Sequence, residues 1–155
     1  MMETPLDTFD RKILALVQRD CQLKAEVIAD TVGLSASAVQ RRLKRMRSDM
    51  VIRAEVAVVD SKAVGRPMTF VAGLEIRENY ESLPRIRNWA ANRPEVQQVY
   101  YVTGSVDLVM IITAENVTDY DAITARLMVE NPQITRINTN VILDTLKIGM
   151  YVPVE

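Results

Sequence analysis

The sequence lacks histidine and has a single cysteine among its 155 residues. Without histidine it cannot build Ser/His/Asp or Cys/His catalytic groups or a histidine metal site. One cysteine, Cys21, cannot close an intrachain disulfide or form a zinc cluster. We therefore expect no metal, no other cofactor and no enzyme, and an unpaired thiol agrees with a cytoplasmic location.

Long apolar runs are also missing. The longest stretch without a charged residue covers residues 96–106, 11 residues in all, whereas a membrane-spanning helix needs about 20 apolar residues. The first 12 residues are polar and acidic and have no apolar core of a signal peptide. We expect no membrane segment.

Charge is nearly balanced overall, with 19 basic and 20 acidic residues, but it is unevenly distributed. Residues 1–62 carry 11 basic and 9 acidic side chains, a net charge of +2, and residues 63–155 carry 8 and 11, a net charge of −3. Residues 41–53 hold six basic side chains opposed only by Asp49. A basic cluster of this kind is typical of a local nucleic-acid contact on an otherwise neutral protein.

The first 50 residues predict three helices. In the first, Asp7 is the expected N-cap, Asp10 the capping-box acid, and Phe9 begins an apolar stripe at helical spacing. Gly33 is expected to end the second helix in a left-handed conformation, and Ser35 to cap the third. The apolar stripes of the three helices are Phe9, Ile13, Leu16 and Val17; Ala25, Ile28, Ala29 and Val32; and Val39, Leu43 and Met46.

The segment from Ala29 to Val39 has the spacing of a helix-turn-helix. Ala29 is small enough to let two helices approach, Gly33 four residues later can make the turn, and Val39 can fill the core between the helices. The alternative is a three-helix bundle with a solvated basic face. DNA binding is favoured because the basic side chains concentrate on the third helix, which would enter the major groove.

The third predicted helix supplies the candidate DNA contacts. Its periodicity predicts that five side chains project away from the apolar stripe: Ser37, Gln40, Arg41, Lys44 and Arg45. Ser35 and Ser37, at its N-terminal end, can bond phosphate oxygens or base edges. Gln40 and Arg41 are candidates for base contacts, because glutamine pairs with adenine and arginine with guanine. The predicted phosphate contacts are Arg42, Lys44, Arg45 and Arg47. If two subunits each neutralise about three phosphates, the log–log slope of affinity against salt should be about −5.

Beyond residue 50 the apolar period changes from helical to alternating. Residues 52–59 predict a hinge strand, and residues 61–67, with Gly65 and Pro67, predict a loop. Strands are then expected at 69–76, 96–103, 108–114 and 134–143, and helices at 83–92 and 117–130, with Pro84 in a first helical turn. The order βαββαβ predicts an α+β chain, a helix-turn-helix joined to a ferredoxin-like domain with an antiparallel sheet.

Two helices can cover only one face of such a sheet. The other face would leave valine, isoleucine and tyrosine side chains in water, and an exposed apolar surface of that size usually marks an interface. We therefore expect a homo-oligomer, at least a dimer, formed through this face.

Taken together, these segments resemble the Lrp/AsnC family of bacterial and archaeal transcription regulators. The resemblance is carried by residues 32–35 (Val-Gly-Leu-Ser), 41–46 (Arg-Arg-Leu-Lys-Arg-Met), 51–53 (Val-Ile-Arg) and 102–107 (Val-Thr-Gly-Ser-Val-Asp). It implies a DNA-binding domain at 1–50, a hinge strand and linker at 51–67, and an effector-binding and oligomerisation domain at 68–155. It also implies dimers that assemble into tetramers or octamers, double-stranded DNA as a partner, and an amino acid or related metabolite as effector.

An effector that is an amino acid needs an acceptor for its ammonium and donors for its carboxylate. The candidates are Asp107, the backbone near Gly104, and the hydroxyls of Thr103 and Thr139. The alternative for this turn is an ordinary hairpin in which the aspartate bonds local backbone.

The chain departs from the family pattern in two places. Met50 stands where the family commonly has glycine, so a left-handed backbone there would be strained. Ser105 and Val106 replace an acidic and an aromatic residue in the effector turn, which predicts a neutral or apolar ligand.

Two other classes of function remain open. The first is a small-molecule-binding or enzymatic ferredoxin-like domain with an incidental helical extension, which should carry a convergent pair of catalytic carboxylates. The second is a structural assembly protein, which should form oligomers without salt-dependent DNA affinity.

Overall fold

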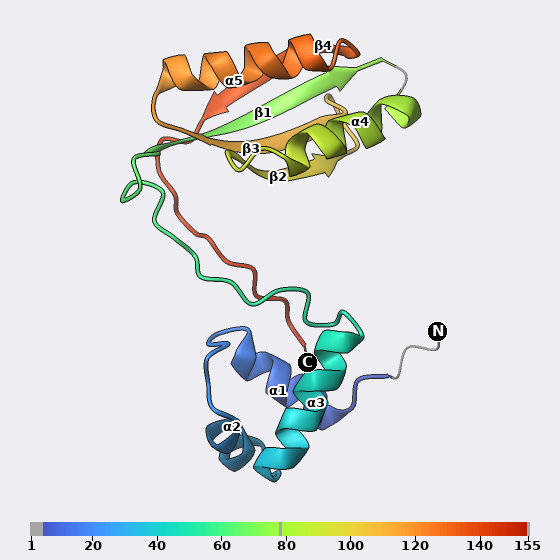
Figure 1. Ribbon diagram of the computed structural model, residues 1–155, viewed down its shortest axis with the longest axis vertical. Coiled ribbons are helices and arrows are strands. Elements are labelled where there is room, and N and C mark those ends of the chain that lie inside the picture. The colour runs from blue at the N-terminus through green and yellow to red at the C-terminus, as the bar shows by residue number, and fades with distance from the viewer. Residues whose placement is uncertain (1–4, 78, 155) are drawn as a thin grey trace. The chain divides into compact units, whose positions relative to one another are not determined.

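The structure is a computed structural model that describes residues 5–77 and 79–154. The chain divides into two compact units (Figure 1). The first consists of Met1–Ala57 with Lys147–Glu155, and the second of Val58–Leu146. The described residues contain no helix long and apolar enough to cross a membrane.

The first unit contains the three predicted helices, α1 (Thr8–Val17), α2 (Ala25–Val32) and α3 (Ala36–Ser48). Asp7 and Asp10 form the predicted capping box at the start of α1. Gly33 ends α2 with φ 79° and ψ 42°, and the Ser35 side chain accepts a hydrogen bond from Ala38 N at 3.2 Å. The predicted start and stop signals of the motif are confirmed.

The core of this unit comes from one face of each helix. Its buried side chains are Ile13, Leu14, Val17, Ile28, Ala29, Val32, Val39, Leu43 and Met46. Helices of 8–13 residues are marginal in isolation, so this shared burial, about 1.5–3 kcal/mol for each large apolar side chain, holds them in place. The predicted place of Phe9 in the core stripe is wrong: it is 37% exposed, and Asp10 occupies a fully buried position instead.

The segment after α3 differs from the expected hinge strand. Residues 53–60 form no strand with any described residue, because an extended chain becomes a strand only when its backbone groups find ladder partners. Met50, just before this segment, has φ 57°. The left-handed backbone is therefore present at the position where the sequence offers methionine instead of glycine.

The second unit is the predicted α+β sandwich with βαββαβ order (Figure 1). Its elements are β1 (Met68–Ile76), α4 (Asn79–Ala91), β2 (Val96–Tyr101), β3 (Leu108–Ala114), α5 (Val117–Glu130) and β4 (Ile134–Val141). The strands pair antiparallel in the order β2-β3-β1-β4. The predicted fold class is confirmed.

Both helices pack on the same face of the sheet. Phe70, Ala72 and Leu74 of β1 are buried in one cluster with Ile86 of α4 and Leu127 of α5. Because side chains alternate along a strand, the residues between them face away from the helices. There Val71 is the cross-strand partner of Ile111, and Gly73 of Val109. Val71, Val109 and Ile111 are half-buried on this side of the sheet, and Gly73 between them is buried against Val106. This side, which neither helix covers, is called the open face below.

The helix predicted at 83–92 begins four residues earlier than expected, at Asn79. Pro84 consequently lies inside α4 instead of in its first turn. The Ser82 hydroxyl donates to Arg77 O at 2.9 Å and ties the first turn of α4 to the residue that follows β1.

The C-terminal end of the chain belongs to the first unit. Gln18, the C-cap residue of α1, donates from Nε2 to Val152 O at 3.0 Å and accepts from Val152 N at 2.7 Å, so it bonds both backbone polar groups of Val152. The Arg19 guanidinium lies 5.4 Å from the Tyr151 ring centroid. These contacts fasten the terminal segment to α1.

Candidate nucleic-acid interface

The position of α3 follows from the small residues that seat it. Ala29 of α2 is 4% exposed, and Val39 of α3 is completely buried in the same cluster. Gly33 makes the turn between the two helices and donates its amide to Ala29 O at 2.9 Å. The opposite side of α3 is left at the surface of the unit.

The outward face of α3 carries polar and cationic side chains that are spaced so as to lie on one side of the helix. Ser37, Gln40, Arg41 and Lys44 are all exposed and stand at positions i, i+3, i+4 and i+7, which lie on one face of a helix. None of the four makes an ion pair with a described residue. This outward face is free to meet a partner.

The N-terminal end of α3 holds two hydroxyls. Ser35 Oγ accepts from Ala38 N and lies 3.1 Å from Ser37 Oγ. Both residues are exposed. Ser35 is thus partly committed to capping, and Ser37 is the more available of the two for an outside acceptor.

Two of the predicted phosphate contacts are ion-paired instead of free. Arg42 NH1 donates to Asp7 Oδ2 at 2.7 Å and to Asp10 Oδ1 at 2.8 Å, and Arg45 NH2 donates to Asp10 Oδ2. Arg45 was predicted to project away from the helical core; it is only half exposed because the buried Asp10 carboxylate draws it toward α1. Sequence reasoning identified Asp10 only as a capping acid and missed this pairing.

The pKa directions agree with this geometry. The Arg42 guanidinium has its pKa raised by hydrogen bonds to Asp10 and then Asp7. The pKa of Asp7 is lowered, first by the Asp10 backbone amide and then by Arg42.

A third cation, Arg47, is paired at the end of α3. Its NH2 and Nε donate to the two carboxylate oxygens of Glu55 at 2.8 and 3.1 Å, and this bonding raises the pKa of Arg47. Both side chains keep substantial exposure, 47% and 31%. A pair this exposed is weak and open to exchange, so Arg47 can leave Glu55 for a phosphate more readily than Arg42 can leave Asp10.

The predicted effector residues do not come together within one chain. Thr103, Gly104 and Asp107 belong to the turn between β2 and β3, and Gly104 has φ 123°. Thr139 is on β4 opposite Ala72 and therefore faces the helices, where its hydroxyl lies 2.6 Å from the Tyr120 hydroxyl. The structure separates Thr139 from the turn.

The turn itself is held by hydrogen bonds of the Asp107 backbone and carboxylate. Asp107 N donates to Leu74 O at 2.8 Å, Asp107 Oδ2 accepts from Ile76 N at 2.8 Å, and Val102 N donates to Asp107 O at 2.9 Å. Asp107 thus ties the turn to β1. Thr103 and Gly104 are exposed at its tip.

A helix-turn-helix with an exposed polar recognition face, joined to an α+β sandwich with one open face, defines a DNA-binding transcription regulator. Comparison with protein families agrees: the AsnC-type helix-turn-helix domain matches residues 6–47, and the Lrp/AsnC ligand binding domain matches residues 69–152. An HTH-type transcriptional regulator of Sinorhizobium fredii is 42% identical over 97% of this chain and 89% of its own length. The chain belongs to the Lrp/AsnC family of transcription regulators, and it is not an enzyme.

Solved structures show the same architecture. An AsnC family transcriptional regulator from Agrobacterium tumefaciens, 29% identical, superposes with a TM-score of 0.87 over 96% of this chain and 97% of its own. A transcriptional regulator from Neisseria meningitidis, solved in complex with L-Met, has a TM-score of 0.87 over the same shares at 20% identity, which establishes a common fold.

Proposed function

We propose that this protein binds double-stranded DNA through the outward face of α3 and changes that binding in response to an amino acid or a related metabolite. The observation that carries the proposal is the alignment of Ser37, Gln40, Arg41 and Lys44 on one exposed face. With 13 residues, α3 is about 20 Å long, and a major groove about 12 Å wide accepts a helix.

The side chains have different parts in this proposal. Gln40 and Arg41 contact base edges, since each can form two hydrogen bonds to a purine. Lys44 and Ser37 contact phosphates, with Ser35 as a further donor at the helix start. Arg47 joins them by exchanging Glu55 for a phosphate. Arg42 and Arg45 serve mainly to fix α3 on α1 through Asp10.

Recognition of DNA by such a motif normally requires two copies. Helix-turn-helix dimers read half-sites about one helical turn or a multiple of it apart. The open face offers Val71, Val109 and Ile111 to a second copy, and burying apolar surface of this kind stabilises association. We propose a homodimer through this face and further assembly into tetramers or octamers.

The proposed response uses the turn between β2 and β3. Thr103 and Gly104 are exposed at its tip and Asp107 holds it on β1, so residues of another subunit are needed to enclose a ligand there. The N. meningitidis regulator of the same fold was solved with L-methionine, which agrees with an effector of this class. Acting on chromosomal DNA, the protein would work in the cytoplasm.

The test is a DNA-binding titration against fragments of the protein's own upstream region, at several salt concentrations and with a panel of amino acids. The proposal expects retention that weakens steeply with salt and shifts with at least one amino acid. DNA retention that no amino acid changes would remove the effector part of the proposal. An absence of DNA retention at every salt concentration would contradict the whole proposal.

A further inference from the structure

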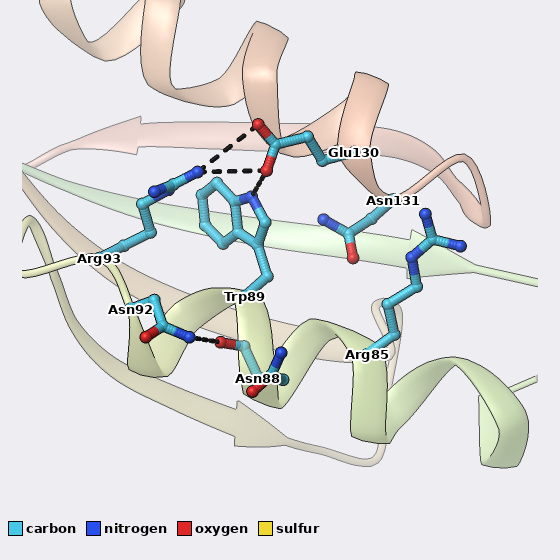
Figure 2. Close-up of a pocket in the computed structure, with 7 residues that line it drawn as sticks. All are labelled: Arg85, Asn88, Trp89, Asn92, Arg93, Glu130 and Asn131. Carbon is cyan, nitrogen blue, oxygen red and sulfur yellow. Dashed lines mark hydrogen bonds and ion pairs between the residues drawn. The ribbon is translucent and has the colours of Figure 1, made fainter.

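A cavity of about 400 Å³ lies between the C-terminal parts of α4 and α5, away from the turn discussed above. Figure 2 shows side chains of α4, among them Arg85 and Trp89, directed toward α5, and Glu130 and Asn131 directed back toward α4. Arg93, just after α4, closes one side. The walls are unusually polar for a groove between two amphipathic helices.

Asn131 gives this cavity a buried acceptor without a partner. The side chain has no exposed surface, and its Nδ2 donates to Leu127 O at 3.0 Å. That bond fixes the orientation of the amide, because the opposite orientation would set two oxygens against each other. The remaining atom, Oδ1, is buried and has no hydrogen-bond partner. A buried unpaired acceptor is costly, so a donor that reaches it from the cavity would bind favourably.

On the other side of the cavity, Arg93 and Trp89 are organised by Glu130. The carboxylate of Glu130 accepts from Trp89 Nε1 at 2.7 Å and from Arg93 NH2 at 3.1 Å. Arg93 lies 5.2 Å from the Trp89 ring centroid, and its Nε is buried without a partner. The negative charge of Glu130 is therefore already neutralised by Arg93 and cannot repel a second carboxylate as strongly as a free glutamate would.

Arg85 leaves the cavity with an excess of positive charge. It is exposed and makes no ion pair or hydrogen bond with a described residue. Arg85 and Arg93 outweigh Glu130 by one unit. An anionic group is favoured at this end, and a planar carboxylate suits the fork of a guanidinium.

We infer that this cavity is a second small-molecule site that takes a carboxylate bearing an N–H or O–H donor on the adjacent carbon, as in α-amino and α-hydroxy acids. The carboxylate pairs with Arg85, whose exposed side chain turns to meet the ligand, and the donor reaches Asn131 Oδ1. The site lies within one chain and shares no residue with the turn at 103–107. It would add a second input to the proposed regulator.

Trp89 is the only tryptophan of the chain and lines the cavity, so its fluorescence reports binding in the full-length protein. The titrants are the proteinogenic α-amino acids, L-lactate, and propionate, which has the carboxylate without the donor. We expect a saturable change in Trp89 emission with at least one α-amino acid or with L-lactate. Propionate should bind at least about tenfold more weakly because it leaves Asn131 Oδ1 unpaired.

Two arginine variants test whether the titrant binds in this cavity. Arg85→Ala should weaken the response at least about tenfold, and Arg87→Ala, an exposed arginine on the same helix that does not line this cavity, should leave it unchanged. The absence of a saturable response up to about 100 mM of any titrant, or a response that Arg85→Ala leaves unaltered, would overturn the inference. DNA retention, measured in parallel, tests the proposed function separately, since Arg85 lies outside α3.

Discussion

The carboxylate of Asp10 on α1 holds the guanidinium of Arg42 on α3 at 2.8 Å, although Asp10 has no exposed surface. The same carboxylate also bonds Arg45, and the Arg42 guanidinium lies 5.6 Å from the Phe9 ring centroid. A buried acid that satisfies two arginines joins the first helix to the recognition helix. The basic segment therefore contains two kinds of cation, one that holds the motif together and one that is available to DNA.

Removing the charge of Asp10 should destabilise the helix-turn-helix. Asp10→Asn removes the carboxylate paired with Arg45 and one of the two carboxylates paired with Arg42, and we expect a loss of about 3 kcal/mol. Amide hydrogen exchange in α3 measures this loss of stability, because local opening raises the exchange rate. Asp30→Asn, an equal charge change at an exposed position of α2, is the control and should have almost no effect. Equal exchange rates in both variants would contradict the structural role of Asp10.

Replacing Met50 with glycine should stabilise the first unit. Its φ of 57° is unfavourable for a residue with a Cβ, and relief of that strain exceeds the extra unfolded-state entropy of glycine. We expect Met50→Gly to stabilise the first unit by about 0.5–1 kcal/mol in a urea titration followed by circular dichroism. Val51→Gly, one residue later and also exposed, should destabilise instead. A loss of stability in both variants would mean that the turn gains nothing from glycine.

Substitutions at Gly73 and Val106 should have non-additive effects on the free energy of unfolding. A Cβ added at Gly73 would lie 3.0 Å from Val106 Cγ1, which forces the valine and the effector turn to move. We expect Gly73→Ala to cost about 1–3 kcal/mol in Trp89-monitored unfolding, and much of this loss to disappear when it is combined with Val106→Ala. Additive losses in the double variant would show that the two residues do not constrain each other.

Because of Tyr120, the free energy of unfolding should decrease as the pH rises into the alkaline range. Burial raises the pKa of its hydroxyl, and the hydrogen bond with Thr139 opposes the rise. Since the folded state holds this proton more tightly than the unfolded state, its contribution is complete below the ordinary tyrosine pKa of about 10 and is lost as pH rises above it. Thermal unfolding across this range should become less pH-dependent in Tyr120→Phe. An unchanged pH dependence would exclude Tyr120 as its source.

The sequence predicts most of the fold because burial and periodicity coincide there. Val39, Leu43 and Met46 are buried as their spacing indicates, and β3 and α5 begin and end at the predicted residues. The prediction of a hinge strand at 52–59 was wrong because alternation alone cannot supply a partner strand. Pro84 was misplaced because a helix beginning at Asn79 tolerates it.

The candidate site was less predictable. Helical periodicity correctly placed Gln40, Arg41 and Lys44 on the exposed face. The pairing of Arg42 with Asp10 joins residues 32 positions apart. A pattern within one helix cannot reveal a contact between residues so far apart in the sequence. A signal was nevertheless present, since Asp10 falls on the buried side of α1 with Ile13 and Leu14, where a carboxylate requires a cationic partner.

The salt dependence of DNA binding by Arg41→Ala/Lys44→Ala tests the central claim most directly. With Arg42 and Arg45 paired to Asp10, Lys44 and Arg47 remain to contact phosphates on each α3, so a dimer should show a log–log slope of about −4, shallower than −5. The double variant should lose most DNA affinity and about half of the slope, because Arg47 is retained. Arg87→Ala/Arg126→Ala, with the same charge change on exposed positions of the second unit, should keep both. Wild-type affinity and slope in Arg41→Ala/Lys44→Ala would contradict DNA recognition through the outward face of α3.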